Sequence, residues 1–116
     1  MRALVGSIAM LLFLTAIALA ADVGPAADVA SVRAAAHAKN PKSQLLGVHV
    51  VGNYGLSDWA EGESSGYGVY KRVSGQQWKQ IDWGGGAIDV DLLVKDGMSR
   101  QTAQQLCSGW GDSSPC

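Results

Sequence analysis

Three tryptophans are the most promising candidates for a binding surface in this sequence. Trp59, Trp78 and Trp83 lie close together in the middle of the chain. Indole rings offer a large apolar area with one N–H donor, and they are enriched where proteins bind partners. In an extended chain Trp59 is in phase with Glu61, and Trp78 with Gln80. We therefore expect at least one ring on a polar face, binding a peptide, a sugar or a protein; the alternative is packing beneath helices.

A copper site is a second hypothesis, because histidine and methionine bind this metal. The chain has two histidines, His37 and His49, and Met98 could join them. Neither histidine has an acidic residue or a cysteine at ligand spacing, so the three would form a site only if the fold brought them together. One surface histidine and one half-buried histidine is the simpler interpretation, and we predict no cofactor.

Hydrolysis would need a nucleophile with its base, or two facing carboxylates. Asp58, Glu61 and Glu63 cluster near the end of a predicted strand. They would suit a small hydrolase if they converged in a cleft. The polar segment Glu61–Gly66, expected as a loop, would suit an inhibitor of a hydrolase if it entered another protein's site. No nucleophile motif accompanies these acids, so a catalytic role is disfavoured.

The first 20 residues predict a secretory signal peptide. Arg2 precedes an apolar run from Ala3 to Ala20 that ends in Ala-Leu-Ala, the pattern that signal peptidase cleaves. The alternative is a retained membrane anchor, since the run is just long enough to span a bilayer. Cleavage after Ala20 would leave residues 21–116 as a single small domain, free of the membrane, in the periplasm or outside the cell.

Two cysteines remain after this cleavage, Cys107 and Cys116. An exported protein meets an oxidising compartment, where an even number of cysteines in a small domain indicates a disulfide. Chain entropy gives such a short loop a contribution of about 2.5–3 kcal/mol. A metal-binding pair is the alternative, and the spacing suits it poorly.

The charge balance argues against nucleic acid as a partner. The chain has 9 basic and 10 acidic side chains and a net charge of −1, whereas DNA binding needs a surface that neutralises phosphates. The segment Leu92–Leu106 superficially resembles a helix-turn-helix but carries few charges. Gly84–Gly86 could cradle an anion at a helix start, but Asp89 and Asp91 would repel it.

The elements that must position these residues follow from hydrophobic spacing and turn signals. One helix begins at Gly24-Pro25 and stops at Asn40-Pro41. Short linkers join four strands into an antiparallel meander, at Leu45–Val51, Tyr54–Ala60, Tyr67–Val73 and Gln77–Trp83. In the first strand we expect Leu46, Val48 and Val50 on one face. Two short helices follow, Asp89–Lys95 and a last one from Ser99 to Leu106. The sequence thus predicts an α+β domain with its helices on one face of the sheet.

Part of the sequence resembles a family of small exported bacterial proteins, some labelled copper uptake system-associated proteins. The resemblance covers about residues 50–106 and rests on an ordered series of positions, Val51, Gly52, Asn53, Tyr54, Leu56, Trp59, Gly62, Trp78, Gly85, Gly86, Ala87, Ile88, Leu93, Gly97, Met98, Ala103 and Leu106. It implies a shared fold, and its copper label implies no ligand set. Trp83 stands where such members often have a cysteine, which speaks against a thiol-dependent metal site.

The interpretation that these observations favour is an exported, non-catalytic binding or accessory module. We expect it to be a monomer or a weak oligomer that meets an unidentified protein or small molecule through one face of its sheet. A copper-handling accessory protein is the first alternative, and a small hydrolase or hydrolase inhibitor is the second.

Overall fold

A computed structural model describes residues 22–111 and 114–116. Its elements are α2 (Ala26–Lys39), β1 (Gln44–Val51), β2 (Tyr54–Glu61), β3 (Ser64–Ser74), β4 (Gln77–Gly85), α3 (Val90–Lys95) and α4 (Arg100–Cys107). The strands form one antiparallel sheet in the order β1-β2-β3-β4. The predicted α+β fold, with an N-terminal helix, a four-stranded meander and two short C-terminal helices, is confirmed. The predicted signal peptide lies outside the described residues.

Local signals fix most element boundaries. The side chain of Asp89 accepts a hydrogen bond from the N–H of Leu92 at 2.8 Å and caps α3, and Ser99 caps α4 through the N–H of Thr102 at 3.1 Å. The expected two-residue hairpin joins β1 to β2, with Gly52 at a positive φ of 58°. Among the described residues, no helix is long and apolar enough to cross a membrane.

The prediction of a loop over Glu61–Gly66 was wrong. Strand β2 runs to Glu61 and β3 begins at Ser64, so that only a tight turn, with Gly62 at a φ of 59°, connects them. The segment is polar because the turn and the strand residues next to it are exposed to solvent. Polarity alone does not distinguish an exposed strand from a loop.

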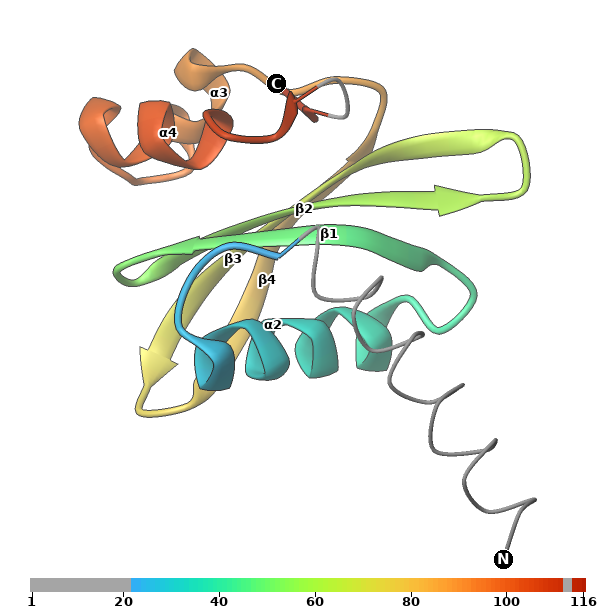
Figure 1. Cartoon of the computed structure of the whole chain (residues 1–116), viewed down its shortest axis with the longest axis horizontal. Coiled ribbons are helices and arrows are strands. Elements are labelled where there is room, and N and C mark those ends of the chain that lie inside the picture. Colours follow the sequence, from blue (N-terminus) through green and yellow to red (C-terminus); the bar gives the residue numbers. More distant parts are fainter. Residues whose placement is uncertain (1–21, 112–113) are drawn as a thin grey trace, which may run out of the picture.

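The expectation that all helices lie on one face was also wrong. Helix α2 covers one face of the sheet, whereas α3 and α4 cover the other (Figure 1). On the α2 side the core is Val29, Val32, Ala36, Val48, Val50, Tyr70 and Trp78. On the opposite side it is Leu56, Val69, Ile88, Leu93, Met98, Ala103 and Leu106. Both faces of the sheet are therefore buried, and the strands carry apolar side chains on both of these faces.

Irregular pairing in β1 and β4 changes which side chains share a face. In β1, Leu45 pairs with Trp59 and Gly47 with Asp58, so Leu46 is left over. Leu45 consequently packs toward α2 while Leu46 is 44% exposed, which corrects the expectation that Leu46 shares a face with Val48 and Val50. Each bulge shifts the strand's phase by one residue.

The bulge in β4 has the same effect on two tryptophans. Tyr70 pairs with Gln80 and Val69 with Asp82, leaving Ile81 unpaired. Trp78 and Trp83 are five positions apart and would lie on opposite faces of a regular strand. The extra residue brings both to the α2 face.

Strand β3 presents glycine to that face where the sheet passes beyond the end of α2. A Cβ atom at Gly66 would overlap the Trp59 ring and the backbone of β4, and one at Gly68 would overlap the hydroxyl groups of Ser57 and Tyr70. These two hydroxyls are 2.9 Å apart and buried. The absence of side chains on β3 thus leaves room for groups from β2 and β4 to meet above it.

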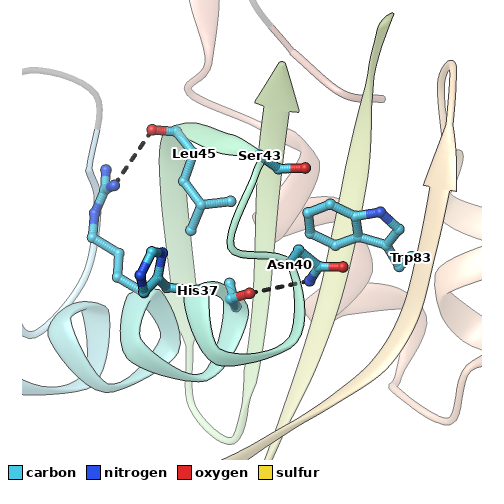
Figure 2. Close-up of a pocket in the computed structure, with 7 residues that line it drawn as sticks. His37, Asn40, Ser43, Leu45 and Trp83 are labelled. Carbon is cyan, nitrogen blue, oxygen red and sulfur yellow. Dashed lines mark hydrogen bonds between the residues drawn. The ribbon is translucent and has the colours of Figure 1, made fainter. Parts of the chain in front are cut away.

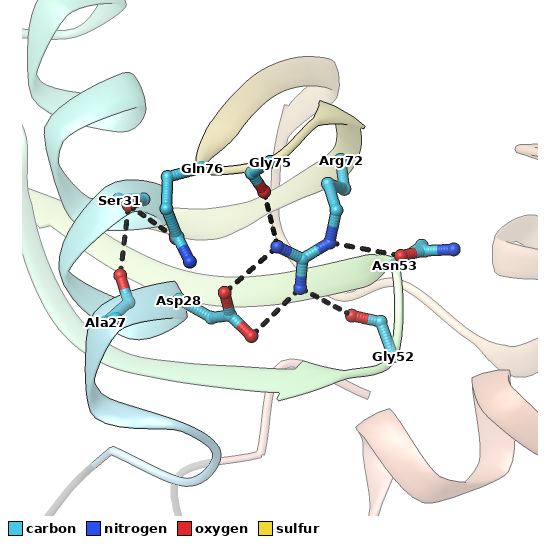
Figure 3. Close-up of polar contacts among 8 residues, drawn as sticks. All are labelled: Ala27, Asp28, Ser31, Gly52, Asn53, Arg72, Gly75 and Gln76. Carbon is cyan, nitrogen blue, oxygen red and sulfur yellow. Dashed lines mark hydrogen bonds and ion pairs between the residues drawn. The ribbon is translucent and has the colours of Figure 1, made fainter.

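Arg72 ties α2 to the β1–β2 and β3–β4 turns (Figure 3). Its guanidinium donates to both carboxylate oxygens of Asp28 on α2, at 3.0 and 2.9 Å. It also donates to the Gly52 carbonyl, the Asn53 side chain and the Gly75 carbonyl. The hydrogen bond from Arg72 lowers the pKa of Asp28. The same guanidinium lies 4.6 Å above the centre of the Trp78 ring and covers it.

The predicted disulfide joins Cys107 and Cys116, with Cα atoms 5.5 Å apart. It holds the C-terminal tail against the end of the sheet, where the carbonyl of Pro115 accepts a hydrogen bond from Ile88 at 2.8 Å. The tail therefore forms part of the molecular surface beside β2 and β3.

Replacing Gly66 with alanine should destabilise the protein by about 1–3 kcal/mol, because the added methyl group collides with Trp59 and the backbone of β4. Urea unfolding measures the loss. Gly85 pairs with Gly66 across the ladder, and a Cβ there would meet only the Ser65 carbonyl at 3.8 Å. Gly85→Ala is thus the matched control, and an equal loss in both variants would contradict the close approach at Gly66.

Candidate functional site

Trp59 and Trp83 stack on each other at the end of the sheet. Their ring centres are 5.0 Å apart and their planes differ by 5°. The rings come from β2 and β4, which flank the glycines of β3. Trp59 is 8% exposed and its indole N–H donates to the Tyr67 carbonyl at 3.0 Å, whereas Trp83 is only half-buried. Trp83 is therefore the member of the pair that a partner can reach.

A cavity of about 180 Å³ opens beside Trp83, between the sheet and the C-terminal end of α2 (Figure 2). Ala36, Leu45 and Trp83 provide apolar walls. The polar lining comes from Arg33, His37, Asn40 and Ser43. Apolar walls with a few polar groups at the rim are typical of binding sites.

The polar groups of this cavity are held in place by hydrogen bonds. The side-chain amide of Asn40 donates to the side-chain oxygen of Gln80 at 2.7 Å and to the Ala36 carbonyl at 3.1 Å. These bonds fix the end of α2 on β4. Arg33 forms a bidentate pair with Asp22, with its shorter contact at 2.6 Å. Ser43 donates to Glu61 at 2.9 Å on the exposed rim. The cavity thus has a preformed shape.

Of the three predicted binding residues, the structure brings together Trp59 and Trp83 and sets Trp78 apart. Trp78 is buried beneath α2 and under Arg72, and its indole N–H has no hydrogen-bond partner among the described residues. Its place is in the core. Asn40, Ser43, Gly66 and Gly68 belong to the site but were not singled out from the sequence; two glycines flanking Tyr67 in a strand, between two tryptophan-bearing strands, were the signal available.

The predicted metal ligands do not come together. His37 is exposed on α2, whereas His49 lies on the opposite face of the sheet, buried and stacked on Trp110 with ring centres 3.7 Å apart. Met98 is buried in the core beneath α3 and α4. His37 is the expected surface histidine, but His49 is fully buried rather than half-buried, and burial lowers its pKa. Within the described ranges, no three histidine, cysteine or acidic side chains form a group suited to a metal.

The three acids considered for hydrolysis are also separated. Asp58 points to the α3 and α4 side of β2, and the strand's alternation turns Glu61 to the other side. Glu63 is exposed in the turn between β2 and β3. A cleft with convergent carboxylates is therefore not formed by these residues.

A second group of acids lies beside Tyr67 on the α3 and α4 face. Burial, followed by a hydrogen bond with the carboxyl group of Asp82 and the charge of that group, raises the pKa of Asp96 to about 6. Two carboxyl groups share a hydrogen bond only when one of them holds a proton. The burial of Tyr67, together with the charges of Asp82 and Asp96, raises the pKa of the Tyr67 hydroxyl group.

Comparison of the chain with protein-family models, with curated proteins and with solved structures finds no match. The resemblance to small exported bacterial proteins accordingly stays a prediction.

The Asp96 carboxyl group should make stability depend on pH. Its folded pKa of about 6 exceeds the ordinary 3.8, so the folded state keeps a proton that the unfolded state loses between these values. The free energy of unfolding should therefore fall as the pH rises from about 4 to 6 and level off above. Asp96→Asn should remove this decrease. The difference in free energy of unfolding between the variant and the natural protein should therefore be more favourable to the variant at pH 7.5 than at pH 4.5.

Urea unfolding at both pH values measures this effect. Asp91→Asn on the same helix is the control for the lost charge, because the Asp91 side chain is 78% exposed. The buried His49 acts in the opposite direction, since its lowered pKa makes stability fall as the pH drops below its ordinary 6.5. A pH profile that is the same in Asp96→Asn as in the natural protein would contradict the shared proton.

Proposed function

We propose that this protein is an exported, non-catalytic binding module that recognises a peptide or a protein segment through the cavity beside Trp83. The observation that carries the proposal is the Trp59–Trp83 stack, which places a half-buried indole at the wall of a cavity with hydrogen-bonding groups at its rim. Tryptophan in such a position commonly provides much of the binding energy of an interface.

The size of the cavity favours a side chain of a macromolecular partner over a free small molecule. Sites for small molecules typically measure about 300–1,000 Å³, and this cavity measures about 180 Å³. A volume of that order suits one inserted apolar side chain. The backbone of the partner would then lie across the rim, where Asn40 and Ser43 offer polar contacts.

Export is supported by two features that point the same way. The first 20 residues have the pattern of a signal peptide. Cys107 and Cys116 are within disulfide geometry, and structural disulfides are typical of oxidising compartments. We propose the periplasm or the extracellular space as the location.

Selection of a random linear-peptide library on the exported protein tests this function. Selected peptides should share one large apolar residue, and their affinity, measured by fluorescence polarisation, should fall about tenfold or more in Trp83→Ala, corresponding to about 1.4 kcal/mol. Ser43→Trp should also weaken binding, because the new ring would block the rim without removing a buried contact.

Val73→Ala is the matched control, since Val73 is an exposed apolar residue at the other end of β3. Its affinity for the selected peptides should equal that of the natural protein. Unfolding curves verify that each variant is folded. Peptides that bind all four proteins equally, or a selection that yields no peptide sensitive to Trp83, would contradict the proposed site.

A further inference from the structure

Asp58 carries a buried carboxyl group whose burial the rest of the protein compensates only in part. The residue is 8% exposed, and its Oδ1 atom has no hydrogen-bond partner among the described residues. Burial raises the pKa of this carboxyl, and hydrogen bonds from the backbone of Asp58 and Gly47 offset the effect only in part. Arg33, which attracts it electrostatically, is already paired with Asp22 at 2.6 Å.

A buried carboxylate with one oxygen left unpartnered is unfavourable in the free protein, because the charge loses part of its hydration. Residues that reduce stability in this way are expected where a ligand supplies the missing partner. The partner for a carboxylate oxygen is a hydrogen-bond donor, and a cationic donor forms the stronger bond.

Asp58, on the α3 and α4 side of β2, lines a cavity of about 360 Å³ at the end of the sheet, and Trp59 and Gly66 also contribute to its lining. This volume falls within the range of about 300–1,000 Å³ that is typical of ligand sites. Leu46, Ala87 and Pro115 give it apolar walls, and Ser65 and Ser114 add hydroxyl groups. The bulge in β1 is what turns Leu46 outward to form this wall.

The walls of the cavity are held by their own hydrogen bonds. Gly86 donates to the Ser65 carbonyl at 2.9 Å, and Ile88 donates to the Pro115 carbonyl at 2.8 Å. The disulfide between Cys107 and Cys116 fixes the tail that carries Pro115. These groups are engaged, whereas Oδ1 of Asp58, a buried atom of a residue that lines the cavity, is an acceptor without a partner among the described residues.

We propose that this cavity binds an organic cation, an ammonium or guanidinium group whose N–H donates to Oδ1 of Asp58. The alkyl part next to the charge would contact Leu46, Ala87 and Pro115, as the stems of lysine and arginine do on apolar surfaces. The cation belongs either to a basic side chain of a peptide or to a free alkylamine. The proposed contact at Asp58 does not rest on the proposed peptide site at Trp83, although Trp59, which stacks on Trp83, also lines this cavity.

Titration of the ¹⁵N-labelled, disulfide-bonded exported protein tests the proposal with two cationic probes, n-butylammonium and the capped peptide Ala-Ala-Lys-Ala-Ala. Each has a neutral counterpart, n-butanol and the same peptide with norleucine. A cationic probe should give saturable shifts at the amides of Gly47, Asp58 and Ala87, and its neutral counterpart should not. Binding of the amine alone assigns a free amine, and binding of the peptide alone assigns a basic side chain; both support the proposal.

Asp58→Asn should weaken the binding of the active probe about tenfold or more, because the amide keeps the shape and loses the charge. Glu63→Gln removes an exposed acid of the adjacent turn and should leave the affinity unchanged. Leu46→Trp fills the cavity from its exposed edge and should abolish binding even if Asp58→Asn does not fold.

The free energy of unfolding provides a readout that separates a ligand site from a structural carboxylate. Without ligand at pH 7.5, Asp58→Asn should raise the urea midpoint, because the unpaired buried charge is gone. The proposal is overturned if neither cationic probe binds, if the neutral counterparts bind equally well, or if Asp58→Asn destabilises the protein and binds the probe as tightly as the natural protein does.

Discussion

Strand β3 presents two different faces, and the architecture of the sheet follows from this difference. On the α3 and α4 side it offers Tyr67 and Val69 to a packed core, while on the α2 side it offers Gly66 and Gly68. The glycines form a floor on which Trp59 and the partly exposed Trp83 stack from the two neighbouring strands. A side chain at Gly66 would displace that stack, so a backbone requirement in β3 decides whether the aromatic site exists.

The two ends of the sheet have different roles. At one end, Arg72 joins Asp28 of α2 to the carbonyls of Gly52 and Gly75, and thereby holds the β1–β2 and β3–β4 turns to the helix. Both cavities lie toward the other end, beside the bulge at Leu46 in β1 and beyond the bulge at Ile81 in the middle of β4, whereas a third irregularity, at Val73 of β3, lies at the Arg72 end. Bulges redirect side chains and are enriched near functional sites. The end held by Arg72 thus supports the end that carries the two cavities, where bulges place Leu46 and Trp83 on other faces than a regular strand would.

Signals that act within a few residues were readable from the sequence. The caps at Asp89 and Ser99 and the turn at Gly52 specify their own hydrogen bonds or backbone angles, so the α3 and α4 helices and the first hairpin lie where predicted. The faces of the sheet were not readable, because the bulges at Leu46 and Ile81 each shift the phase by one residue and leave no trace in hydrophobic spacing. The sequence marks Asp58 only as one of three nearby acids, since its cavity is completed by Ser114 and Pro115, which are distant in the chain.

The contact between the Trp59 and Trp83 rings across β3 is the central claim of this account, and it is directly measurable. A ¹⁵N- and ¹³C-edited NOE spectrum of the exported protein reports which indole protons are close. The account predicts NOEs between the rings of Trp59 and Trp83, whose centres are 5.0 Å apart, and none from either ring to Trp78. A Trp83 ring with no NOE to Trp59, or one in contact with Trp78, would contradict the glycine floor and the binding site built on it.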